Sequence, residues 1–155
     1  MEEKGRADRA KELFMQGYNC AQSVAGAYAD LLGLPFETAV RLASGFGGGI
    51  GRLREVCGAM CGAALVLGAV YGYEDPKAFA AKKELYEQVQ QAAGAFQLEN
   101  GFLRCRDLLG LDKDARPSAS PEKRSEEYYR KRPCADIVFT AADILQRRLQ
   151  QDGKL

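Results

Sequence analysis

The feature that most constrains this fold is a run of 18 residues, Val56 to Tyr73, that carries no charged side chain. The run is rich in Gly and Ala rather than Leu and Ile, and its length lies near the lower limit for a membrane-spanning helix. We therefore expect a buried central helix in a soluble domain and no membrane span. Its glycines form two pairs with a spacing of four residues: Gly58 and Gly62, then Gly68 and Gly72. A glycine inside a helix costs about 1 kcal/mol relative to alanine, so this spacing predicts a face that a neighbouring helix or a ligand approaches closely.

The rest of the chain shows helical periodicity, and signals for β-strands are almost absent. Before the central helix, the pattern predicts a short helix that ends near Gly17, a helix from the N-cap residue Asn19 to Gly33, and a third from Pro35 to Ser44. After it, we expect a long helix opened by Pro76 with Phe79, Leu85, Tyr86, Val89 and Ala93 on its inner face. Residues 94–101 are interpreted as a connection. Further helices are predicted around Cys105–Leu109, Glu126–Lys131 and Cys134–Gln150.

These elements predict an all-α fold. We expect one domain over residues 1–155, a bundle of six to eight helices around the Gly/Ala-rich central helix, with a polar loop at about residues 112–124. The 22 Lys and Arg residues nearly balance the 21 Asp and Glu residues, for a net charge of +1. This balance argues against nucleic acid or a membrane surface as the partner.

The chain contains no histidine and five cysteines. The missing histidine excludes Ser-His and Cys-His catalytic pairs, His-ligated zinc and the C-x-x-C-H attachment of haem c. Four of the first six residues are charged and the segment contains no apolar signal-peptide core, so we expect a cytoplasmic protein with reduced thiols. The cysteines are therefore the main candidates for chemically active side chains.

Several cysteines are predicted to lie at helix starts, where the helix dipole lowers the pKa of a thiol. Cys20 follows Asn19, Cys134 follows Pro133, and Cys105 lies near the start of its short helix. Cations are close in sequence: Arg52 and Arg54 before Cys57, Arg104 and Arg106 around Cys105, and Arg130, Lys131 and Arg132 before Cys134. Such settings favour thiolates, as a redox or metal-thiolate site requires. The alternative is that each cysteine is a small apolar core residue.

Cys57 and Cys61 are four residues apart, so they lie on one face of the central helix. They could supply two ligands to one cluster, although the spacing is not that of zinc knuckles or ferredoxins.

The segment Gly45-Phe46-Gly47-Gly48-Gly49-Ile50-Gly51 predicts a tight loop that exposes its backbone. Its N–H groups, at Gly47, Gly48 and Gly49, could hold an anionic cofactor together with Arg52 and with Gly58 and Gly62 of the following helix. The alternative is a close-packed turn that leads the chain into the central helix. The segment does not match a nucleotide-binding P-loop.

Taken together, the motifs Gly17-Tyr18-Asn19-Cys20-Ala21-Gln22, Gly45–Gly49 and Cys57-Gly58-Ala59-Met60-Cys61-Gly62, followed by Cys105 and Cys134, resemble the C_GCAxxG_C_C family of redox-active proteins. The resemblance runs from about Arg9 to Ala142. It implies an all-helical fold related to that of split-Soret cytochrome c, in which Cys20, Cys57, Cys105 and Cys134 converge. Cys61 is an addition to the family pattern. The relatives' haem attachment motif is absent, so no haem role is transferred.

The resemblance implies a small redox protein, acting by thiol–disulfide exchange or by holding an iron–sulfur cluster. In the cluster form, or with another soft metal, the candidate ligands are Cys20, Cys57, Cys61, Cys105 and Cys134. An alternative is a non-catalytic helical module that binds a metal or ligand and docks on a partner such as a transporter. A third hypothesis is a homodimer with purely structural cysteines. The sequence identifies neither substrate nor redox partner.

Overall fold

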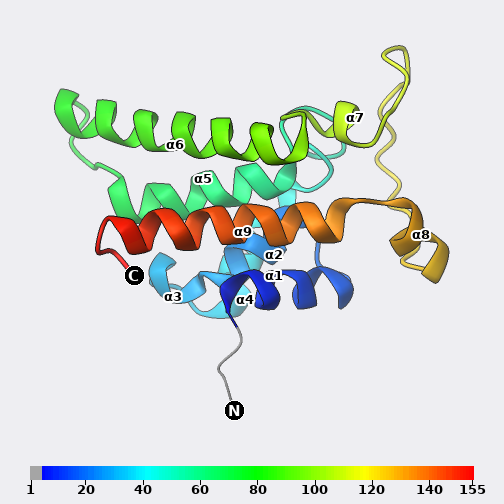
Figure 1. Cartoon of the computed structure of the whole chain (residues 1–155), viewed down its shortest axis with the longest axis horizontal. Coiled ribbons are helices and arrows are strands. Elements are labelled where there is room, and N and C mark those ends of the chain that lie inside the picture. Colours follow the sequence, from blue (N-terminus) through cyan, green and yellow to red (C-terminus); the bar gives the residue numbers. More distant parts are fainter. Residues whose placement is uncertain (1–4) are drawn as a thin grey trace.

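The structure, a computed structural model, describes residues 5–155. Its regular elements in that range are nine α-helices and one 3-10 helix, so the predicted all-α fold is confirmed (Figure 1). The described helices exceed the expected six to eight by one, because the helix expected from Asn19 to Gly33 is divided in two. No helix among these residues combines the length and the apolarity that crossing a membrane requires. The elements are α1 (Arg6–Met15), α2 (Cys20–Ala27), α3 (Ala29–Leu32), α4 (Phe36–Ala43), η1 (Ser44–Phe46), α5 (Gly58–Tyr71), α6 (Phe79–Asn100), α7 (Cys105–Leu108), α8 (Glu126–Lys131) and α9 (Cys134–Gln151).

Helix α5, the Gly/Ala-rich segment, packs against α2, α6 and α9, and α9 also lies along α1 (Figure 1). Most of the buried side chains form one continuous core between these helices. Along α9 the buried residues include Ile137, Val138, Ala141, Ile144 and Leu145. Their spacing of three to four residues is the one-sided stripe that a helix presents to a core.

Local signals set several helix ends. The Asn19 side chain accepts from the backbone N–H of Gln22, and the Gln22 side chain accepts from the N–H of Asn19, so both orphan donors at the start of α2 are satisfied. Gly33 ends α3 in the left-handed conformation, with φ of 68°. The helix expected from Asn19 to Gly33 is divided at Tyr28, whose backbone leaves helical values.

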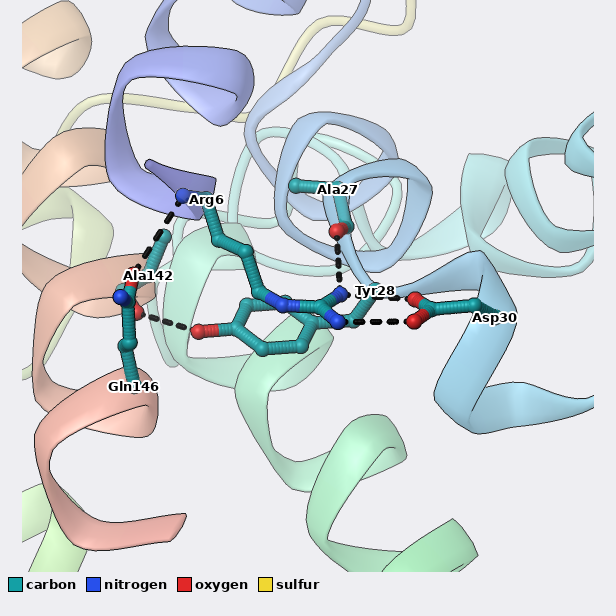
Figure 2. A network of polar contacts seen from close by, with 6 residues as sticks. All are labelled: Arg6, Ala27, Tyr28, Asp30, Ala142 and Gln146. Atoms are coloured by element: carbon teal, nitrogen blue, oxygen red, sulfur yellow. Dashed lines mark hydrogen bonds and ion pairs between the residues drawn. The ribbon is translucent and has the colours of Figure 1, made fainter. Parts of the chain in front are cut away.

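The break at Tyr28 is the centre of a polar network that joins α1, α3 and α9 (Figure 2). The buried Tyr28 hydroxyl donates to the Ala142 carbonyl at 2.7 Å. The guanidinium of Arg6 lies over the Tyr28 ring and donates to both carboxylate oxygens of Asp30 at 2.7 Å. This ion pair lowers the pKa of Asp30, while burial raises that of Tyr28. The network satisfies a buried hydroxyl that would otherwise destabilise the core.

Helix α6 differs from the sequence prediction in two ways. It runs without interruption through Gly94 to Asn100, so the connection predicted over residues 94–101 is wrong except at Gly101, where φ is 91°. The expected inner face is also partly wrong, because Phe79 and Tyr86 are 78% and 51% exposed. Since α6 packs on one side only, against α5 and α9, it buries a single narrow stripe.

The two glycine pairs of α5 have different environments. A Cβ added at Gly58 would lie 2.9 Å from the Phe46 carbonyl oxygen, and one at Gly62 would lie 2.8 Å from the Ala21 carbonyl oxygen. Gly58 and Gly62 therefore form the face on which η1 and α2 approach the α5 backbone. A Cβ at Gly68 would meet nothing within 4 Å, and Gly72 follows the last residue of α5. The close approach predicted for the glycine face is thus made by other helices of the same chain, and it occurs at Gly58 and Gly62.

This contrast gives a matched test within one helix. Gly62→Ala should lower the free energy of unfolding by about 1–3 kcal/mol because the added methyl overpacks the α2 contact. Gly68→Ala should raise it by about 0.4–1 kcal/mol, since alanine fits the space and the unfolded chain loses conformational entropy. Urea unfolding of the two variants and the parent measures both effects. Equal effects of the two substitutions would contradict the assigned packing.

Candidate functional site

Four cysteines from distant parts of the chain line one small cavity. Cys20, Cys105 and Cys134 are the first residues of α2, α7 and α9, and Cys57 is the N-cap of α5. Together they line a space of about 60 Å³. All five cysteines are free thiols. Cys61 does not line this cavity, and its Sγ lies 3.7 Å from the Val56 carbonyl oxygen.

A short antiparallel contact brings the segments of Cys57 and Cys105 together. Val56 and Arg104 form an isolated β-bridge. The N–H of Cys57 donates to the Leu103 carbonyl at 3.0 Å, and the N–H of Cys105 donates to the Glu55 carbonyl at 2.6 Å. Both thiols are thereby fixed at the wall of the cavity, with the residues 5% and 8% exposed.

The glycine-rich segment forms a tight turn over these cysteines. Residues 48–52 are all left-handed, with φ between 55° and 73°. Non-glycine residues in this conformation cost roughly 1–2 kcal/mol each, and Ile50 and Arg52 are two of them. The N–H groups of Arg54 and Glu55 donate back to the Gly48 and Gly49 carbonyls at 3.1 and 3.0 Å, closing the turn.

Glycine at position 49 permits the closest approach of the turn to a thiol. A Cβ there would lie 2.7 Å from the Cβ of Cys105 and 2.7 Å from the backbone nitrogen of Glu55. Gly48, Gly49 and Gly58 line the cysteine cavity. Gly47 and Arg52 instead line a larger neighbouring cavity, and Gly62 lines neither because it packs against α2.

Cys134 and Cys20 interact directly, and the interaction separates their acidities. The Cys20 thiol donates a hydrogen bond to the Cys134 sulfur, which lowers the pKa of Cys134 to about 7 against the opposing effect of burial. The positive charges of Arg132, Arg124 and Arg54 lower it further. The same contact with Cys134, followed by burial, raises the pKa of Cys20 well above its usual value.

Contrary to expectation, neither the helix start at Cys20 nor the arginines that precede Cys57 make these two thiols acidic, because the pKa of each is raised. Burial raises the pKa of Cys57 to about 12, although the backbone N–H groups of Ala59 and Met60 lower it in part. Burial also raises the pKa of Cys61. For these groups the desolvation of a thiolate outweighs the helix dipole, whose effect is smaller and confined to the first turn.

The four thiols have the chemistry of a soft-metal site, but their arrangement does not fit one. No three His, Cys, Asp or Glu side chains among residues 5–155 are grouped closely enough to hold a metal ion. Ligation of an iron–sulfur cluster or another soft metal by Cys20, Cys57, Cys61, Cys105 and Cys134 stays a prediction.

Comparison with known families agrees with this geometry. The protein-family model described as "Putative redox-active protein (C_GCAxxG_C_C)" matches residues 18–148. The chain belongs to the C_GCAxxG_C_C family. No match was found among curated proteins or among solved structures. The structure gives a reason for two residues of the family motif, since Gly58 and Gly62 allow α2 and α5 to meet.

Two residues of the site carried no sequence signal. Arg124 lies in the polar loop predicted over residues 112–124, and Tyr128 lies in α8, yet both line the cysteine cavity. Arg124 reaches it by donating to the Phe14 and Tyr18 carbonyls at 2.9 and 3.0 Å, contacts that span more than 100 residues of sequence. The sequence indicates Arg132 only as one of three cations that precede Cys134.

The Cys134 thiol should react with iodoacetamide at a rate that inflects near pH 7, well below the ordinary thiol value of about 8.5. Cys20→Ala removes the hydrogen-bond donor, so the inflection should move to higher pH. Mass spectrometry of the Cys134 peptide after timed labelling gives the rate. Cys61→Ala is the matched control and should leave the inflection unchanged. An inflection near pH 9 in the parent would contradict the assigned thiolate.

Proposed function

We propose that this protein carries out thiol–disulfide exchange, with Cys134 as the attacking thiolate and Cys20 as the resolving thiol. The observation that carries the proposal is that both thiols line one small cavity, where their interaction acidifies Cys134 and keeps Cys20 protonated. Membership of a redox-active family supports it.

The position of Cys134 suits attack on a disulfide. It begins an 18-residue helix and is surrounded by arginines, two features that stabilise a thiolate. An attacking thiol is most effective when its pKa lies near the ambient pH, because a still lower pKa weakens the nucleophile. Cys57 and Cys105 are more deeply buried, so they are less accessible to a partner.

The exchange proceeds in two balanced steps. The Cys134 thiolate attacks one sulfur of a partner disulfide, a new S–S bond forms, and the other partner sulfur leaves as a thiolate. Cys20 then attacks the Cys134 sulfur and its proton passes to a released partner sulfur, which forms the Cys20–Cys134 disulfide and leaves the partner as one thiol and one thiolate. Two electrons pass from the dithiol to the partner, and the reverse sequence oxidises a partner dithiol.

Equilibration of the reduced protein in dithiothreitol redox buffers of graded potential tests the proposal. A two-electron transition should appear, with a Cys20–Cys134 disulfide in the peptide map of the oxidised form. Cys134→Ser and Cys20→Ser should each abolish this transition, whereas Cys61→Ser should leave its midpoint in place.

A different result would reject the exchange mechanism. Absence of the Cys20–Cys134 disulfide at every potential would contradict it. Tight zinc in the purified protein, with no change that depends on potential, would instead favour the metal-binding module and its transporter-type partner.

A further inference from the structure

A second, larger cavity adjoins the four cysteines. It has a volume of about 280 Å³ and is bordered by η1, the glycine turn, the 112–124 loop and α8. The two cavities share the lining residues Asn19, Gly48, Arg54, Arg124, Tyr128 and Arg132. A molecule in the larger cavity would therefore lie against the same arginines that surround the Cys134 thiol. We call this space the arginine cavity.

The charge of the arginine cavity is strongly positive although the chain is nearly neutral. Among the described residues, the charged groups that line it are four arginines and one glutamate: Arg52, Arg54, Arg124, Arg132 and Glu122. Arg132 forms an ion pair with Glu122, and Arg52 Nη2 lies 4.0 Å from the same carboxylate. One carboxylate cannot neutralise four guanidinium groups, so the cavity keeps an excess of positive charge.

Neutral groups hold two of these arginines in place. Arg124 donates to backbone carbonyls, and its guanidinium lies 4.3 Å from the centre of the Phe14 ring. Arg54 donates to the Cys105 sulfur at 3.5 Å. Neither contact cancels the guanidinium charge, so both positive charges remain available to an anion.

Arg52 carries a donor that no described residue satisfies. Its Nη1 is buried and has no hydrogen-bond partner among residues 5–155. The backbone that carries this side chain is held in the left-handed conformation, with φ of 62°. Buried polar groups without a partner are rare in native proteins and call for an explanation. Arg52 lines the arginine cavity, so an anion bound there would bring an acceptor to this guanidinium group.

We propose that the arginine cavity binds the carboxylates of a small disulfide and places its sulfur against Cys134, so that the substrates are low-molecular-weight disulfides bearing carboxylates. This inference rests on the exchange function proposed above. Guanidinium groups bind carboxylates through paired, charge-assisted hydrogen bonds, which the Nη atoms of Arg52 can form. The volume is close to the lower end of small-molecule pockets, and it admits part of a small molecule rather than a folded partner.

The step that the cavity assists is a thiol–disulfide exchange between Cys134 and the substrate. The Cys134 thiolate forms a bond to the nearer substrate sulfur, the substrate S–S bond breaks, and the distal half leaves as a carboxylate-bearing thiolate. Resolution by Cys20 releases the other half. The substrate disulfide is the oxidant, and the protein dithiol supplies both electrons.

Single-turnover oxidation of the reduced protein tests the inference with two probes. Oxidised glutathione carries carboxylates, and bis(2-hydroxyethyl) disulfide is neutral. Arg52→Gln should slow oxidation by glutathione disulfide by about tenfold, the effect of one charge-assisted hydrogen bond, and leave the neutral disulfide unaffected. Arg41→Gln, the same charge change on an exposed face of α4, should affect neither rate. Inorganic phosphate at constant ionic strength should inhibit only the glutathione reaction.

The outcomes separate this inference from the proposed function. If the parent protein oxidises with neither disulfide, the exchange function itself fails. If both disulfides react and Arg52→Gln changes neither rate, the substrate inference alone fails. If Arg52→Gln misfolds and slows both reactions, phosphate inhibition of the parent protein tests the substrate inference instead. Inhibition of the glutathione disulfide reaction alone supports the inference, and absence of such selective inhibition overturns it.

Discussion

The close approach of α2 to the backbone of α5 is the contact on which the site depends. At Gly58 a Cβ would lie 2.9 Å from the Phe46 carbonyl oxygen and 3.3 Å from the Cβ of Cys20. This single glycine therefore touches both the entry to the glycine turn and the first cysteine. Gly62 extends the contact by one helical turn to Ala21 and Val24. A side chain at either position would separate Cys20 from Cys57 and open the cavity that all four cysteines line.

Within that cavity, burial and nearby charge oppose each other and give the thiols different chemistry. Burial raises the pKa of Cys57, and the contact with Cys134 followed by burial raises the pKa of Cys20, which keeps both thiols protonated. Cys134 is half-buried, yet the hydrogen bond from Cys20 and the charges of three arginines more than compensate for the desolvation of its thiolate. One acidified sulfur beside one protonated sulfur is the combination that directional exchange needs, because the first attacks and the second resolves.

The sequence predicts what depends on local interactions. The capping box at Asn19, the left-handed Gly33 and the buried stripe of α9 each involve residues within a few positions of one another. The connection predicted from Gly94 is wrong because glycine also occurs inside helices. Here it lies within α6, where an added Cβ would meet nothing within 4 Å. The convergence of Cys20, Cys57, Cys105 and Cys134 followed from family resemblance and not from spacing.

The elements that complete the site could not be predicted, because their partners are far away in sequence. Arg124 is fixed by carbonyls of α1 and of the turn that follows it, and it reaches the cysteines only through that tertiary contact. The acidity of a thiol also depends on how deeply the finished fold buries it. For this reason, and because Cys20 contacts Cys134, the helix start at Cys20 and the arginines before Cys57 are poor guides to the pKa values of these thiols.

The arginines couple the chemistry of the thiol to the binding of an anion. Arg54, Arg124 and Arg132 lower the pKa of Cys134, and the same three side chains line the arginine cavity. A bound carboxylate and the Cys134 thiolate are therefore stabilised by the same positive charges. Each anion lowers the electrostatic stabilisation of the other. Once Cys134 enters a disulfide its negative charge is gone, and the full field acts on the anion. Because such coupling is reciprocal, an anion held more tightly by the oxidised form would stabilise the proposed Cys20–Cys134 disulfide by the same free energy. The negative charge of a carboxylate-bearing substrate would thus favour electron transfer from the dithiol to the substrate. The same carboxylate would also position the substrate sulfur.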